Sequence, residues 1–222
     1  MRWPCLSVIY CAFLWPGTLT AQNDPLAQPE PAPLAVILET AGQVMVTFAG
    51  DPGPLPAEED MNLGPGDRVA TGANGSVTIS LRDEHFVRLG GLAALTVREI
   101  RSDQVAGGIW ARLDLARGKL LAVVASLTSA DSRFEVSTPT AIAAVKGTAF
   151  QVVAGRKSST ISVLEGAVAA SGIRDDSAPP EELEVKEGFE TEVDAKTRRP
   201  GPLMKFFNNE KRRKARVALS EF

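Results

Sequence analysis

The sequence has almost no cysteine and almost no histidine. Of its 222 residues, 2 are Cys and 1 is His. Cys5 and Cys11 lie in an amino-terminal segment that we expect to be removed, so no disulfide is expected to stabilise the mature chain. A lone histidine offers no second histidine or cysteine ligand for a transition metal. We therefore expect no metal and no cofactor, and we interpret His85 as a turn residue with solvated neighbours.

Aromatic residues, net charge and long apolar runs are also scarce. Aromatic residues make up 6% of the chain, whereas 19 Gly and 15 Pro favour many short strands and turns. The net charge of −3 is too close to neutral to suggest a nucleic-acid binder. After the amino terminus, no apolar run approaches the ~20 residues that a membrane-spanning helix needs. The sequence therefore predicts no nucleic-acid partner.

The first 21 residues have the pattern of a secretory signal peptide. Arg2 supplies a positive charge, residues 6–15 form an apolar core, and Pro16 breaks it before a cleavage site after Ala21. A retained membrane anchor is the alternative. Residues 22–33 contain four prolines and little to bury, as in an extended linker. We expect the protein to be exported and to be periplasmic or secreted.

From Leu34 onward, apolar residues alternate with polar or small ones. Nine or ten short strands separated by turn signals predict a single all-β domain at residues 34–195. Gly42, Gly118 and Gly166 each precede an apolar strand, which is a weak internal repeat. Such units can stack as a solenoid-like coil or close into a sandwich, and the sequence does not separate the two.

The segment at residues 135–153, EVSTPTAIAAVKGTAFQVV, contains almost nothing suited to acid–base or nucleophilic chemistry. Its pattern predicts two strands joined through a turn of small residues. Pro139 suits a strand start or an edge position, and Gly147 supplies a backbone shape that other residues resist. The segment and its flank present these regularly spaced residues: Phe134, Val136, Thr138, Pro139, Ala141, Ala143, Lys146, Gly147, Thr148, Phe150 and Val152.

This pattern resembles the hallmark of the FecR domain family, and the resemblance extends from about Leu34 to Asp194. The turn at residues 71–75 and the strand after Gly166 also resemble the family. One departure is residues 83–85, where members often have an Asp-Gly turn. Lys146 occupies a position where members often carry Arg. It is either a solvated residue at a turn or a cation that contacts a ligand or partner.

The resemblance implies an extracytoplasmic sensor or scaffold that acts by protein–protein contact. Regulatory members also carry an anti-sigma segment and a transmembrane helix, neither of which the sequence shows. We therefore expect a non-catalytic binding module for an envelope protein or an envelope polymer, of unknown identity. The alternatives are a secreted carbohydrate-active enzyme that uses carboxylates on a β scaffold, and a structural envelope protein.

The carboxy-terminal part of the chain changes from acidic to basic. Residues 175–194 contain nine acidic residues, which we interpret as a solvated, partly disordered surface. Residues 196–222 form a basic tail with nine Lys or Arg, and residues 203–219 have apolar positions suited to a short amphipathic helix. The tail could make weak contact with an anionic membrane surface. It could equally fold back onto the acidic run.

Overall fold

A computed structural model describes residues 34–51, 53–82, 84–102, 109–126, 132–173 and 181–205, and all regular structure within them is β. No helix long and apolar enough to cross a membrane occurs among these residues. The strands are β1 (Ala35–Ala41), β2 (Val44–Thr47), β3 (Leu55–Pro56), β4 (Arg68–Thr71), β5 (Ser76–Leu81), β6 (His85–Leu89), β7 (Ala94–Ser102), β8 (Ile109–Val124), β9 (Arg133–Ser137), β10 (Ala141–Val145), β11 (Thr148–Ala154), β12 (Ser158–Glu165), β13 (Ala167–Gly172), β14 (Glu182–Lys186), β15 (Phe189–Asp194) and β16 (Met204–Lys205).

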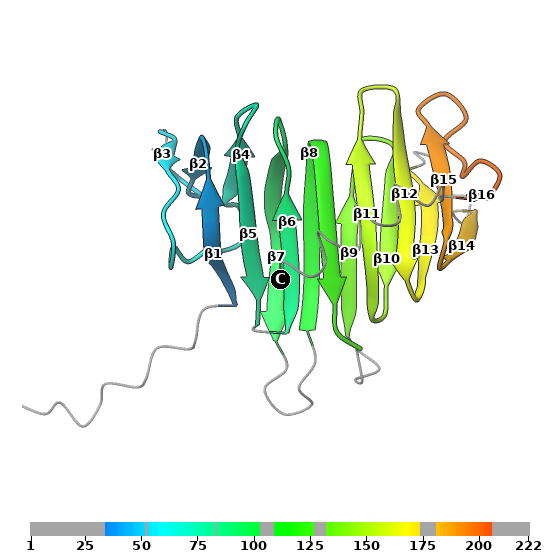
Figure 1. Cartoon of the computed structure of the whole chain (residues 1–222), viewed down its shortest axis with the longest axis horizontal. Helices are drawn as coiled ribbons and strands as arrows, with labels where there is room; N and C mark the ends of the chain where they lie inside the picture. Colours follow the sequence, from blue (N-terminus) through cyan, green and yellow to red (C-terminus); the bar gives the residue numbers. More distant parts are fainter. Residues whose placement is uncertain are drawn as a thin grey trace, which may run out of the picture. The chain divides into compact units, whose positions relative to one another are not determined.

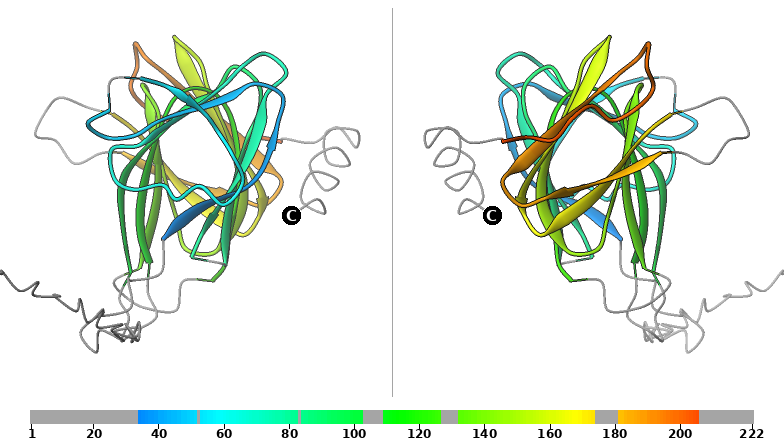
Figure 2. Two further views of the ribbon diagram at one scale, coloured as in Figure 1. Left: turned by 90° about the vertical axis from the view of Figure 1, so that its left-hand side faces the viewer. Right: turned by 90° about the vertical axis from the view of Figure 1, so that its right-hand side faces the viewer.

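The strands form two layers that face each other across the core (Figures 1 and 2). We call them sheet A, with the order β1-β5-β6-β8-β11-β12-β15-β16, and sheet B, with the order β3-β2-β4-β7-β8-β9-β10-β13-β14. Both orders follow the chain from one end of the layers to the other. The expected all-β fold is confirmed.

Strand β8 belongs to both sheets, because it bends at Gly118. Residues before the bend pair with β7 and, in parallel, with β9 in sheet B. Residues after it pair with β6 and β11 in sheet A. This strand joins all sixteen strands into one hydrogen-bonded network.

The chain crosses between the sheets at several such corners. Gly42 lies between β1 and β2, Gly147 between β10 and β11, and Gly166 between β12 and β13, all with positive φ. The glycines of the sequence repeat therefore mark places where the backbone leaves one sheet for the other. The two packings that the sequence left open are combined here, since the molecule has two facing sheets wound by a coil-like path.

The core fills the space between the sheets and follows the period-two pattern. Val77, Ile79 and Leu81, which alternate along β5, are each 1% exposed. Phe134 of sheet B meets Phe150 of sheet A edge to face, with ring centroids 6.4 Å apart. Such a pair contributes about 1 kcal/mol beyond the burial of its area. The layers are held together by side chains that the alternation directs inward.

Three local expectations are corrected by the structure. Residues 135–153 contribute to three strands, β9, β10 and β11, instead of two. Pro139 does not start a strand but lies in the turn between β9 and β10. Because proline has no backbone N–H to donate, it can end the hydrogen bonding between two strands as well as begin it. The described part of the acidic run forms β14 and β15, whose inward residues Val185 and Val193 are buried.

The three segments expected at the chain ends lie mostly outside the residues that the structure describes. The signal peptide at residues 1–21 and the linker at residues 22–33 lie wholly outside the described residues. Of the expected helix at residues 203–219, only residues 203–205 are described. Met204 and Lys205 form strand β16, because they pair with Glu190 and Phe189 of β15.

Gly118→Ala should destabilise the protein far more than Gly50→Ala. Both glycines have positive φ, but a Cβ at Gly118 would lie 2.4 Å from Ala93 Cα, whereas one at Gly50 would have nothing within 4 Å. The backbone strain costs about 1–2 kcal/mol at either site, and the overlap adds roughly 1–3 kcal/mol at Gly118 alone. Urea unfolding of both variants measures the difference, and equal losses would contradict the corner packing.

Candidate binding groove

The residues singled out by the sequence motif lie mostly in the core. Phe134, Val136, Thr138, Ala141, Ala143, Thr148, Phe150 and Val152 are buried, whereas Pro139 and Lys146 are exposed and Gly147 is half-buried. The motif therefore builds the junction of β9, β10 and β11 and presents only two of its side chains to solvent. Lys146 is the one with a charge.

The Thr138-Pro139-Thr140 turn is held by a chain of buried hydroxyl groups. Thr140 Oγ1 donates to Ser159 Oγ at 2.7 Å, and Ser159 Oγ donates to Thr138 Oγ1 at 2.9 Å. Thr138 Oγ1 donates in turn to the Ala141 carbonyl at 3.0 Å and accepts from the Ala141 N–H at 2.9 Å. Because Ser159 belongs to β12 in sheet A, this chain fastens the turn of sheet B to the opposite layer.

The Lys146-Gly147 corner is just as tightly fixed. Gly147 has φ +87°, and a Cβ there would lie 2.7 Å from Ser126 Cα. Thr148 Oγ1 donates to the Ala167 carbonyl at 3.3 Å, which ties the corner to β13. The backbone that carries Lys146 is therefore rigid, although the side chain itself is exposed.

A groove of about 640 Å³ begins at this corner and runs across the outer face of sheet B. It crosses β8, β9, β10, β13 and β14, which are neighbours in the sheet. Its lining residues are Trp110, Ser132, Arg133, Ala144, Val145, Lys146, Gly147, Ala167, Val168, Ala169, Glu182 and Glu184.

The first wall of the groove is aromatic and basic. Arg101 and Arg133 place their guanidinium carbons 5.4 and 5.7 Å from the centroid of the Trp110 ring. Trp110 Nε1 donates to Glu99 Oε2 at 3.2 Å, which fixes the orientation of the indole. Such cation–π contacts contribute about 0.5–1 kcal/mol each at exposed sites. The two arginines and Glu99 together hold the ring in place.

A buried carboxylate anchors this wall. The Glu135 side chain is 6% exposed, accepts from Arg112 Nε at 2.9 Å and pairs also with Arg133. Because two cations pair with this nearly buried carboxylate, Glu135 has a structural role in the wall. Lys146, by contrast, has no ion-pair partner among the described residues.

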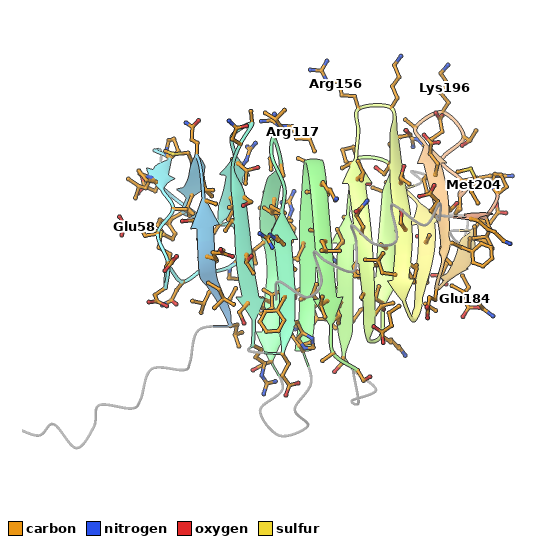
Figure 3. The ribbon with its side chains drawn as sticks, in the orientation of Figure 1. Glu58, Arg117, Arg156, Glu184, Lys196 and Met204 are labelled. Carbon is orange, nitrogen blue, oxygen red and sulfur yellow. The ribbon has the colours of Figure 1, made fainter. Side chains whose placement is uncertain are left out.

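The floor is made of alanines, and the far wall is acidic. Glu135 of β9 stands opposite Ala144, Ala144 opposite Ala169, and Ala169 opposite Glu184. Since neighbouring strands are ~4.8 Å apart, Glu184 lies on the order of 10 Å across the sheet from β10. Figure 3 shows Glu184 projecting from the lower end of the described strands. The groove thus has a cation at one side and carboxylates at the other, with an apolar floor between them.

This arrangement suits a ligand that is flat or extended and carries charge. An anionic group would be attracted to Lys146 and a cationic one to Glu182 and Glu184, while Trp110 and the arginines over its ring add an aromatic and basic surface. In the described part of the chain, no cluster of His, Cys, Asp and Glu is arranged to hold a metal ion.

The sequence identified only Lys146 among the charged and aromatic residues of the groove. Trp110 and Arg112 alternate with the inward residues Ala111 and Leu113, so period two alone places them outside. Which strands lie beside β8, however, depends on the parallel pairing with β9, and no local pattern predicts that pairing. The groove is therefore a product of topology.

The interpretation of His85 as a turn residue with solvated neighbours is wrong. His85 begins β6, is 5% exposed and packs against Phe134 with ring centroids 6.4 Å apart. Its Nδ1 accepts the Ala125 N–H at 3.1 Å. Burial lowers the pKa of His85 below 6.5. The nearby charge of Glu84 raises this pKa, and that of Arg82 lowers it further. The inward alternation of residues 85, 87 and 89 is the signal that could have revealed its burial.

Comparison with known proteins gives one family match. Residues 67–169 match the family model described as FecR protein. No curated protein matches the chain. Among solved structures, two crystal structures of a candidate anti-sigma factor from Parabacteroides distasonis, at 1.65 and 2.50 Å, are each 17% identical with a TM-score of 0.48. The similarity covers 62% of this chain and 57% of that chain, so it spans less than two thirds of the matched protein.

Ser159→Ala should destabilise the fold, because it leaves the hydroxyls of Thr138 and Thr140 without their buried partner. The expected loss is about 1–3 kcal/mol. Ser158→Ala is the matched control, since no side-chain hydrogen bond of Ser158 occurs among the described residues. Chemical denaturation of both variants measures the loss, and equal stabilities would refute the hydroxyl chain as a structural link.

His85 should make the stability of the protein depend on pH. Since its folded pKa lies below the 6.5 of the unfolded chain, its contribution is complete above pH 6.5 and is lost as pH falls through the folded pKa. His85→Gln keeps an acceptor for the Ala125 N–H but cannot take up a proton. The Tm advantage of the natural protein over this variant should therefore be larger at about pH 8 than at about pH 5. A difference that does not vary with pH would rule out titration of His85.

Proposed function

Because this chain carries a FecR domain and so belongs to the FecR family, we propose that it is an exported regulatory module that acts by binding a protein or an envelope polymer. The domains that we assign are a signal peptide at residues 1–21, a linker at 22–33, a β domain at 34–195 and a basic tail at 196–222. Export rests on the signal-peptide pattern of the sequence.

The observation that carries the binding role is the groove on the outer face of sheet B. It is built on strands, and its Trp110 and Arg133 are oriented by contacts with Glu99 and Glu135. Preorganised aromatic and basic side chains lose little freedom when a partner binds, which favours affinity. Trp and Arg are also the residue types that most often dominate binding energy at protein interfaces.

The placement of carboxylates favours binding over glycoside hydrolysis. A glycosidase needs two carboxyl groups on opposite sides of the scissile bond. Here Glu182 and Glu184 lie on the same strand, β14, and Glu135 across the floor is bound by Arg112 and Arg133. Neither side of the groove offers a free carboxyl group opposite another. A structural role in the envelope would need no such groove.

Crosslinking from the groove tests this function. A photo-reactive amino acid at Ala169 should capture a specific envelope component, whereas the same group at Val153, on the outer face of sheet A, should not. Lys146→Glu should reduce capture from Ala169 by about 10-fold, since it reverses the charge of the unpaired cation. Arg68→Glu, at an exposed cation on β4 and outside the groove lining, is the matched charge control.

Two results of this experiment would contradict the proposal. One is capture of the same components with equal yield from Ala169 and Val153. The other is an undiminished yield in the Lys146→Glu variant. Either would mean that the groove is not the contact surface.

A further inference from the structure

A second charged surface lies at the edge of the layers opposite the Gly147 corner. Gly118 of β8 pairs with Ala154, the last residue of β11 before the β11–β12 turn. Ser158, the first residue of β12 after that turn, pairs with Asp194 of β15. The Ala195 N–H donates to the Lys157 carbonyl at 2.8 Å, which joins the segment after β15 to this turn. The bend of β8, the β11–β12 turn and the end of β15 therefore form one continuous edge of sheet A.

Five exposed cations occur on this edge, and we call them the cationic edge. Figure 3 shows three of them, Arg117, Arg156 and Lys196, projecting from the upper end of the strands. Four neighbouring strands, β8, β11, β12 and β15, carry the group, so it spans roughly 15 Å at ~4.8 Å per strand. Its members are Arg117, Lys119, Arg156, Lys157 and Lys196.

None of these five side chains has an ion-pair partner in the described part of the chain. The nearby Asp194 is half-buried, and its Oδ1 accepts the backbone N–H of Lys196 at 2.7 Å. The whole protein has a net charge of −3, so the edge is a local concentration and does not reflect a basic protein. In the first wall of the groove, by contrast, Arg101, Arg112 and Arg133 are paired with glutamates.

An exposed apolar side chain lies beside the cations. Leu92, in the corner between β6 and β7, is 61% exposed and has φ +58°. The corner is fixed, because the Leu92 N–H donates to the Gly72 carbonyl at 2.9 Å. The next residue, Ala93, packs directly against Gly118 of the β8 bend, between Arg117 and Lys119. One leucine at a rigid corner thus adjoins a row of unpaired cations.

From this arrangement we propose that the cationic edge docks on an anionic membrane surface, with the lipid headgroups facing Arg117, Lys119, Arg156, Lys157 and Lys196 and with Leu92 entering the interface. Separate cations in a row, without a pocket or a fixed hydrogen-bonding geometry, match a diffuse negative surface. An exposed apolar residue beside them matches the boundary between headgroups and acyl chains. The surface is separate from the groove, so this inference does not depend on the proposed partner binding.

The sequence assigned membrane contact to the basic tail at residues 196–222. Of that tail, Lys196 belongs to the cationic edge, and the other four cations come from β8 and the β11–β12 turn. The tail and the edge can be separated experimentally, because substitutions at Lys119, Arg156 and Lys157 leave residues 196–222 unchanged.

Vesicle co-sedimentation with the full chain provides the test. The probes are vesicles of phosphatidylcholine alone and of phosphatidylcholine with phosphatidylglycerol at about one third, a strongly anionic surface. The natural protein should bind only the anionic vesicles, and more weakly as salt is raised. Each lysine or arginine near such a surface contributes about five-fold in partitioning, so the triple variant Lys119→Gln, Arg156→Gln and Lys157→Gln should bind roughly 100-fold more weakly.

A matched triple variant, Arg68→Gln, Arg98→Gln and Lys186→Gln, removes the same charge away from the edge and should bind as the natural protein does. Leu92→Ser should weaken binding without changing its salt dependence. Soluble glycerol phosphate should not compete, which separates a membrane from a free phosphate ligand.

The proposal is overturned if the natural protein ignores anionic vesicles, if both triple variants lose binding equally, or if glycerol phosphate displaces the protein. Retention on immobilised polyglutamate without vesicle binding would also overturn it, in favour of an acidic polypeptide. Circular dichroism of each variant shows whether its fold is retained.

Discussion

The structure depends on tight corners at which the chain passes from one sheet to the facing one. At Gly42, Gly118 and Gly147 the backbone adopts positive φ, and another segment lies where a side chain would be. Because each crossing reverses which sheet the next strand joins, these corners set the order of strands in both layers. They also decide which residues face outward together. The groove and the cationic edge are both consequences of that order, since each includes neighbouring strands that are not consecutive in sequence.

The family motif has a structural role that the arrangement of its side chains explains. Its apolar residues join the sheets through Phe134 and Phe150, and its hydroxyl groups fasten one turn to the opposite layer through Ser159. Only Lys146 carries charge to the surface. Apart from Lys146, function is therefore expected from residues outside the motif, on outer faces where many substitutions leave the fold intact.

Much of the fold could be predicted from the sequence, because alternation of apolar residues and glycine spacing are local signals. Val77, Ile79 and Leu81 illustrate this, as does Gly166 before its strand. Local signals gave the wrong number of strands around Pro139, where two short strands follow one alternating pattern. They also failed at His85, because a polar residue there points inward. The groove could not be predicted beyond Lys146, because Trp110, Arg133 and Glu184 meet only through the pairing of five strands. Long-range pairing leaves no local trace.

If the partner binds at the groove, Trp110 lies at the contact and its fluorescence reports the binding. Trp3 and Trp15 lie in the predicted signal peptide, so Trp110 is the single tryptophan of the chain that begins after Ala21. Its fluorescence can be followed while envelope fractions are added to that chain. We expect a saturable change in emission with the fraction that yields the crosslinked component. In Lys146→Glu the same change should need about 10-fold more of that fraction. If the protein retains that component while the Trp110 emission stays unchanged, binding at the groove is contradicted.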